Sequence, residues 1–174
     1  MALCDTLIGI DGSCASNTGG VTKIYVAQFD LITGTTESNG SLTAIGVSGG
    51  TAPFYEFAFN RNTCNYVENG TISIENGSVY YEQIVTLTIP RREAAKKVAI
   101  EKMTAGLQRL VVIVKDSNDL YWYFGLTDGA VVTANTGGSG TAKGDANNYV
   151  ITLTAEEPAM APEVTPGIIA ALLA

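Results

Sequence analysis

Threonine alternates with apolar residues in two separate segments of the chain. Residues 85–89 read Val-Thr-Leu-Thr-Ile, and residues 150–154 read Val-Ile-Thr-Leu-Thr. Because successive side chains of a strand point to opposite faces of a sheet, each segment predicts a strand with one apolar face for a core. The other face is small, polar and uncharged, and it suits either a solvated outer surface or the wall of a water-filled passage. The candidates to line such a passage are Thr86, Thr88, Thr152 and Thr154.

Strands are predicted along most of the chain. They appear as runs of β-branched and aromatic residues that Gly, Asn and Asp interrupt. The expected strands are residues 21–28, 42–47, 54–60, 71–74, 79–89, 110–115, 120–125, 130–133 and 149–155. Turns are expected at three dipeptides that accept positive φ at low cost, namely Asn39-Gly40, Asn69-Gly70 and Asn76-Gly77. Residues 115–119 predict a further hairpin, between two largely buried strands.

One helix is predicted in the middle of the chain. Pro90 suits a first-turn position, residues 91–105 contain no helix breaker, and Gly106 offers a C-terminal stop. The apolar residues of this segment form a broad face, which predicts a helix packed flat against a sheet. They are Ala95, Val98, Ala99, Met103 and Leu107.

The length of 174 residues, with 46% hydrophobic content, is enough for one compact domain with a core. We expect an N-terminal arm at residues 1–20, a β domain at 21–157 and a C-terminal extension at 158–174. The extension ends in an apolar tip, which we expect to dock on its own domain or on a neighbouring subunit. The Gly-rich loop at 136–148 has little to bury, and such loops often order against a partner.

Membrane insertion is not expected. No stretch of the chain reaches the 18 or so apolar residues of a membrane span, and the N-terminus lacks the positive charge of a signal peptide. These features predict a protein made and kept in a cytosol. The cysteines, Cys4, Cys14 and Cys64, are too few and too irregularly spaced for a disulfide framework or a zinc site, so we expect buried thiols.

The charge of the chain is acidic overall but unevenly distributed. The formal net charge is −7, which argues against a protein whose main task is to grip nucleic acid. Basic residues nevertheless concentrate in one short stretch, which suits either a solvated helix face or a surface offered to an acidic neighbour. These residues are Arg91, Arg92, Lys96, Lys97 and Lys102.

Three sequence patterns resemble catalytic, phosphate-binding or metal-binding motifs, but each lacks an essential residue. Residues 46–50 match the G-x-S-x-G hydrolase pattern, but the chain contains no histidine to take the proton of the serine. Lys143 lies in a Gly-rich loop without the Gly-Lys-Ser/Thr order of a phosphate-binding loop. Asp116, Asn118 and Asp119 lack the glycine and distal glutamate of an EF-hand, and they predict a turn. We therefore expect no enzymatic activity, no metal and no cofactor.

The order of several sequence phrases resembles the tail tube proteins of tailed bacteriophages, particularly those of Bacteroidota hosts. The resemblance covers residues 19–157. Its phrases are GG-VTKIYVAQF, FYEFAFNR, VYYEQIVTLTIPRREA, RLVVIVKDSNDLYWYFG, TGGSGTAKGD and NNYVITLTAEE.

This resemblance implies a mainly β fold, a two-sheet β-barrel or sandwich with one flanking helix at about 91–105. It implies rings, usually hexameric, that stack in the virion tail so that strands of every subunit join into a channel for DNA. The implied partners are copies of the chain and other tail proteins such as a tape measure, sheath or terminator, with assembly in the bacterial host cytoplasm. The candidate inter-subunit residues are Arg91, Arg92, Lys96, Lys97, Lys143, Ile168, Ile169, Leu172 and Leu173.

Two other functions are compatible with the sequence. A head–tail connector ring or a capsid decoration protein would share the β fold and the lack of chemistry, but it would not polymerise alone. A ligand-binding β-sandwich would use aromatic side chains as contacts, although neighbouring strand positions point to opposite faces. Its candidate contacts are Tyr80, Tyr81, Tyr121, Trp122 and Tyr123.

Overall fold

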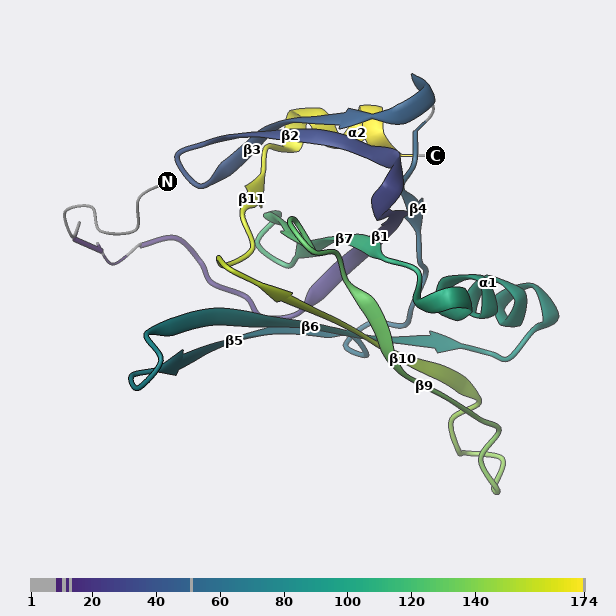
Figure 1. Cartoon of the computed structure of the whole chain (residues 1–174). Coiled ribbons are helices and arrows are strands. Elements are labelled where there is room, and N and C mark those ends of the chain that lie inside the picture. The colour runs from purple at the N-terminus through teal and green to yellow at the C-terminus, as the bar shows by residue number, and fades with distance from the viewer. Residues whose placement is uncertain (1–8, 11, 13, 51, 174) are drawn as a thin grey trace.

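The computed structural model describes residues 9, 10, 12, 14–50 and 52–173. Over these residues the chain is mainly β, with a seven-stranded sheet, a four-stranded sheet and two α-helices (Figure 1). The prediction of a mainly β fold in two sheets is confirmed, whereas the prediction of a single helix is wrong. The helices are α1 (Ala94–Thr104) and α2 (Pro166–Leu172). Short 3-10 turns occupy Phe29–Leu31, Ser48–Gly50 and Ala105–Leu107.

The seven-stranded sheet has the order β2-β3-β11-β8-β7-β1-β4. Its strands are β1 (Val21–Gln28), β2 (Ile32–Ser38), β3 (Ser41–Val47), β4 (Tyr55–Glu56), β7 (Leu110–Asp116), β8 (Tyr121–Phe124) and β11 (Glu163–Val164). The four-stranded sheet is antiparallel throughout, with the order β5-β6-β10-β9. Its strands are β5 (Asn65–Ser73), β6 (Ser78–Pro90), β9 (Val131–Gly138) and β10 (Asn148–Glu157).

The core has two parts, one on each side of β1 and β7. Residues such as Ile24 and Val112 pack toward the four-stranded sheet, where they meet Leu87 and Ile151. The alternate residues of β1 and β7 pack against β3, β11 and α2 on the other side. Strands buried on both faces need apolar residues at consecutive positions, which explains the unbroken run LVVIV at the start of β7.

Several predicted elements are confirmed by the structure. The strand expected at 21–28 is β1, and the hairpin at 115–119 joins β7 to β8. Asn39 and Gly40 both have positive φ, at 52° and 78°, in the turn between β2 and β3. Asn76-Gly77 lies in the turn between β5 and β6.

Other local predictions are wrong. Asn69-Gly70 is not a turn, because both residues lie inside β5 opposite Glu82 and Tyr81. A Cβ atom at Gly70 would lie 3.3 Å from the ring of Tyr81, so the glycine permits the close approach of that ring. The strand expected at 54–60 shrinks to β4, and two strands that the sequence pattern did not predict, β2 and β11, complete the seven-stranded sheet.

The mid-chain helix is shorter than expected and packs by a different face. Pro90 ends β6, Arg91 has a φ of 58°, and α1 begins at Ala94. Of the five residues of the predicted apolar face, only Met103 is buried, and Ile100 is the other buried residue of α1. The helix therefore contacts the core along a narrow line and leaves most of its small apolar residues exposed.

The segment expected as a C-terminal extension is built into the domain. β11 runs parallel to β3 and antiparallel to β8, and α2 follows it. Ile169 and Leu172 of α2 are buried in the core formed with β1 and β7. The apolar tip thus docks on its own domain, which was one of the two expected alternatives. No helix in the described part of the chain is long and apolar enough to cross a membrane.

Candidate assembly surfaces

The face of the four-stranded sheet that points away from the core carries all four predicted threonines. In β6, Val85 and Leu87 are buried while Thr86 and Thr88 are half-buried. The same alternation in β10 leaves Thr152 and Thr154 on the outside. A strand buried on one face shows this pattern because its side chains alternate between core and surface. The pattern of the sequence thus places these side chains on the same face.

Cross-strand pairs hold this face together. Thr86 lies directly opposite Thr152, and Thr88 lies opposite Val150. The hydroxyl groups of Thr154 and Thr133 are 2.9 Å apart and share a hydrogen bond. Pairs of this kind contribute about 0.2–1 kcal/mol each relative to alanine, so the face is regular and ordered rather than a loose surface.

This outer face lacks basic side chains at the positions that the strand register places on it. The positions are Asn65, Val67, Asn69, Thr71, Ser73, Ser78, Tyr80, Glu82, Ile84, Thr86, Thr88, Pro90, Val131, Ala134, Thr136, Gly138, Asn148, Val150, Thr152, Thr154 and Glu156. The acidic residues of this set, Glu82 and Glu156, lie opposite each other in the half of β6 that is nearer to the β5–β6 turn. The face is therefore uncharged from Ile84 to Pro90 of β6 and the residues paired with them, and the charge that it carries elsewhere is negative.

Two long edges of the four-stranded sheet are open. β5 and β9 are its outer strands, and within the described residues no further strand pairs with either. Neither strand contains lysine, arginine or proline, the residues with which natural edge strands commonly prevent pairing with another chain. β5 pairs regularly along its length, whereas β9 has one register shift, at Thr133.

The basic residues near α1 are partly engaged with their own chain. The Lys96 ammonium donates hydrogen bonds to the carbonyl oxygens of Pro90 and Arg91, at 2.6 and 3.1 Å. Arg91 forms an ion pair with Glu93, and the Arg92 guanidinium lies over the ring of Tyr149. Exposed ion pairs of this kind contribute about 0–1 kcal/mol, so these residues remain able to exchange partners at an interface.

The other predicted inter-subunit residues fall into different environments. Lys143 is exposed in the Gly-rich loop, where the carboxylate of Asp145 accepts hydrogen bonds from the backbone of Thr141 and Ala142. These hydrogen bonds lower the pKa of Asp145. Ile168 and Leu173 are half-buried.

The structure corrects the interpretation of Ile169 and Leu172 as inter-subunit residues. Both side chains are buried against their own domain, because the short helix α2 turns them toward the core. Contacts with a second copy would require α2 to leave this site. These two residues therefore belong to the core and not to an exposed surface.

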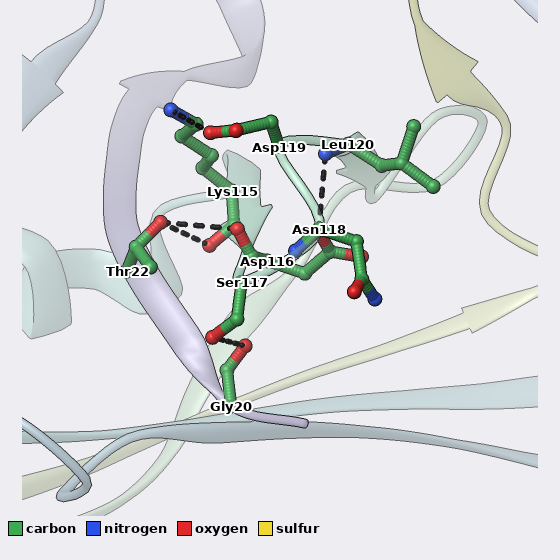
Figure 2. Close-up of polar contacts among 8 residues, drawn as sticks. All are labelled: Gly20, Thr22, Lys115, Asp116, Ser117, Asn118, Asp119 and Leu120. Carbon is green, nitrogen blue, oxygen red and sulfur yellow. Dashed lines mark hydrogen bonds and ion pairs between the residues drawn. The ribbon is translucent and has the colours of Figure 1, made fainter. Parts of the chain in front are cut away.

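A polar cluster in the turn between β7 and β8 is structural (Figure 2). The Asp116 carboxylate accepts hydrogen bonds from the backbone N–H groups of Asn118 and Leu120, at 2.7 and 3.0 Å, and from the indole of Trp122. The Asp119 carboxylate is 2.6 Å from the Lys115 ammonium. The chain's own donors thus occupy these oxygens, and the described residues contain no group of three or more His, Cys, Asp or Glu side chains able to hold a metal.

Two buried polar side chains organise the loops between the sheets, and the sequence analysis did not single them out. Gln83 accepts a hydrogen bond from the N–H of Gly125 and donates one to the carbonyl of Ala159. Glu157 accepts hydrogen bonds from the N–H groups of Thr127 and Asp128. Their spacing in the sequence could have indicated that they are buried. Both occupy inward positions of strands whose other inward residues are mostly apolar.

The cysteines that the structure describes differ in exposure. Cys64 is buried, as expected, and burial raises the pKa of its thiol. Cys14 is exposed in the N-terminal segment, so the expectation of a buried thiol is wrong there. Cys4 lies outside the described residues.

The aromatic residues proposed for a ligand site are divided between the two sheets. Tyr80 and Tyr81 belong to β6 in the four-stranded sheet, whereas Tyr121, Trp122 and Tyr123 belong to β8 in the other sheet. Tyr123 is buried, and burial together with the charge of Glu157 raises the pKa of its hydroxyl.

Comparison with protein-family models, with curated proteins and with solved structures gives no match for this chain.

Proposed function

We propose that this protein is a virion structural protein, a tail tube subunit that forms stacked hexameric rings around a channel for DNA. The observation that carries the proposal is the four-stranded sheet, whose outer face has no basic side chain at its register positions and whose two edge strands have no further strand partner among the described residues. A role in assembly rather than catalysis is part of this proposal. So are its location in the virion tail and its contacts with tape measure, sheath or terminator proteins.

Edge-to-edge pairing explains how such a sheet forms a ring. β5 of one copy pairs with β9 of the next, which is a head-to-tail contact between two different surfaces. Contacts of this type generate a closed ring when the rotation between neighbours closes. Closure pairs both edge strands of the four-stranded sheet and joins the outer faces of all copies into a continuous barrel wall.

The chemistry of the outer face suits a wall along which DNA slides. Proteins retain DNA by neutralising phosphates with lysine and arginine, and each such contact contributes to affinity. The outer face carries neither residue at its register positions, and its charged residues, Glu82 and Glu156, repel phosphates. The hydroxyl groups of the threonines keep the surface wet, and the net charge of −7 disfavours retention of DNA.

Lysine substitutions at the edges test this proposal. Ala134→Lys with Thr136→Lys places two charges on the open strand β9, and light scattering is expected to show loss of ring mass because charged edges resist pairing. Thr86→Lys with Thr88→Lys is the matched control, since the same charges lie on the same face but on the inner strand β6. Rings that survive the edge variant, or a wild-type protein that stays monomeric at high concentration, would contradict the proposal. A single ring that never stacks would favour a connector.

A further inference from the structure

The hairpin between β5 and β6 ends in an exposed apolar tip. It projects from one end of the molecule, beyond the seven-stranded sheet (Figure 1). Ile72 and Ile74 have 70% and 93% of their surface exposed, and Val79 and Tyr80 on the returning strand are also exposed. Several large apolar side chains gathered at one hairpin tip are typical of an interaction site. The tip also carries the acidic residue Glu75, which has no ion-pair partner among the described residues.

An apolar groove of about 660 Å³ lies between α1 and the adjoining ends of β1 and β4. Along one wall, Ala95, Val98 and Ala99 have the i, i+3, i+4 spacing of a single helix face. These three residues are exposed, because α1 uses Ile100 and Met103 to contact the core. The groove therefore includes a helix face that its own domain leaves uncovered.

Charge and position make the tip and the groove complementary. Lys102 lines the groove and, in the described part of the chain, has no ion-pair partner, so it can pair with Glu75. Glu56, the other charged residue of the lining, is already paired with Lys23. The tip and α1 lie at opposite ends of the molecule (Figure 1). A tip therefore cannot reach the groove of its own chain, and a second copy must supply it.

We infer that the β5–β6 hairpin tip of one copy docks into the α1 groove of a second copy and that this contact stacks one ring on the next. This inference rests on the proposed function. β6 runs from the tip to Pro90, shortly before α1 begins at Ala94. The contact therefore joins copies along the strand direction, whereas β5 and β9 join them sideways. Ring closure and ring stacking use separate surfaces, so substitutions can separate them.

Disulfide trapping tests the contact directly. The variant Ile74→Cys with Val98→Cys, in a chain with Cys4→Ser and Cys14→Ser, is expected to form a ladder of covalent oligomers on oxidation. Ile74→Cys with Met160→Cys is the matched control, since Met160 is exposed but does not line the groove. A missing ladder, or an equal ladder from the control, would overturn the inference. This readout does not depend on ring formation, so it also tests the contact in a protein that forms no rings.

Charge reversal provides a second test by electron microscopy. Glu75→Lys and Lys102→Glu are each expected to shorten or abolish tubes while leaving rings intact, and the double variant is expected to restore tubes. Ile74→Asp is expected to give rings without tubes, and its exposed position keeps folding intact. Normal tubes from Ile74→Asp would overturn the inference. A wild-type protein that forms no rings would contradict the proposed function.

Discussion

Thr86 of β6 and Thr152 of β10 lie directly opposite each other on the face of the four-stranded sheet that points away from the core. Their neighbours on the inward side, Leu87 and Ile151, are also paired and are fully buried. One register therefore fixes both the core and the outer face that carries the threonines. A slip by one residue would move the threonines into the core, so the two faces cannot change independently.

Truncation of the inward pair should destabilise the fold. Ile151→Ala is expected to lower the free energy of unfolding by about 2–5 kcal/mol, because it removes buried methyl groups and leaves a cavity. Thr152→Ala on the opposite face is the control, with an expected change within about 0.5–1 kcal/mol. Urea denaturation of the two variants measures the difference. Equal midpoints would contradict the assignment of the inward face to the core.

Lysines on the outer face should make tubes retain DNA. Thr86→Lys with Thr88→Lys is expected to leave folding intact but to cause DNA to co-sediment with tubes at low salt and to dissociate at high salt. Thr33→Lys with Thr35→Lys places the same charges on exposed positions of β2 in the other sheet and is expected to retain less DNA. DNA passage, and ejection in an infectious particle, should be impaired in the outer-face variant. Full infectivity of that variant would contradict the channel assignment.

Glu68 should make stability depend on pH. Partial burial raises the pKa of its carboxyl, although a hydrogen bond from the N–H of Ala161 opposes this shift. A raised pKa means that the folded state binds the proton more tightly than the unfolded state. The stabilisation is therefore complete below the ordinary pKa of glutamate and is lost as the pH rises through the raised value.

The variant Glu68→Gln isolates this effect. The glutamine oxygen can still accept the hydrogen bond from Ala161, but the side chain does not ionise. Thermal unfolding between pH 4 and pH 8 is expected to show the wild type losing stability relative to Glu68→Gln as the pH rises. Parallel curves for the two proteins would show that Glu68 does not contribute.

The two described cysteines should differ in reactivity. Cys14 is exposed, whereas Cys64 is buried and its sulfur accepts a hydrogen bond from the N–H of Thr88. Because the thiolate is the reactive form, the raised pKa of Cys64 slows its alkylation further. Peptide mass mapping after iodoacetamide treatment is expected to find Cys14 modified in the native protein and Cys64 modified after denaturation. Rapid native modification of Cys64 would contradict its burial.

The sequence predicted correctly those elements whose conformation depends mainly on the types of neighbouring residues. The bounds of β1 and the Asn39-Gly40 turn follow from residue types that favour one conformation. Asn69-Gly70 carries the same turn signal, but pairing of the whole of β5 with β6 keeps it extended. β2 contains one large apolar residue, Ile32, so its strand depends on pairing with β3 rather than on its own pattern.

The candidate surfaces were predictable to different degrees. The shared face of Thr86 and Thr152 follows from alternation within each strand, whereas their direct pairing is a long-range contact. The burial of Ile169 could not be predicted, because an apolar tip has the same pattern whether it docks on its own domain or on another copy. The groove beside α1 depends on which helix face meets the core, and the broad apolar face of the sequence left that choice open.

Electron microscopy of the purified protein at high concentration, with light scattering to follow mass, tests the central claim most directly. The account predicts hollow tubes of even width. We take the 13-residue strand β6 to span the height of one ring. With a rise of about 3.4 Å per residue, and strands tilted by up to about 45° from the tube axis, the axial repeat is roughly 30–45 Å. A protein that remains monomeric at every concentration, in the presence and absence of the other tail proteins, would contradict the account.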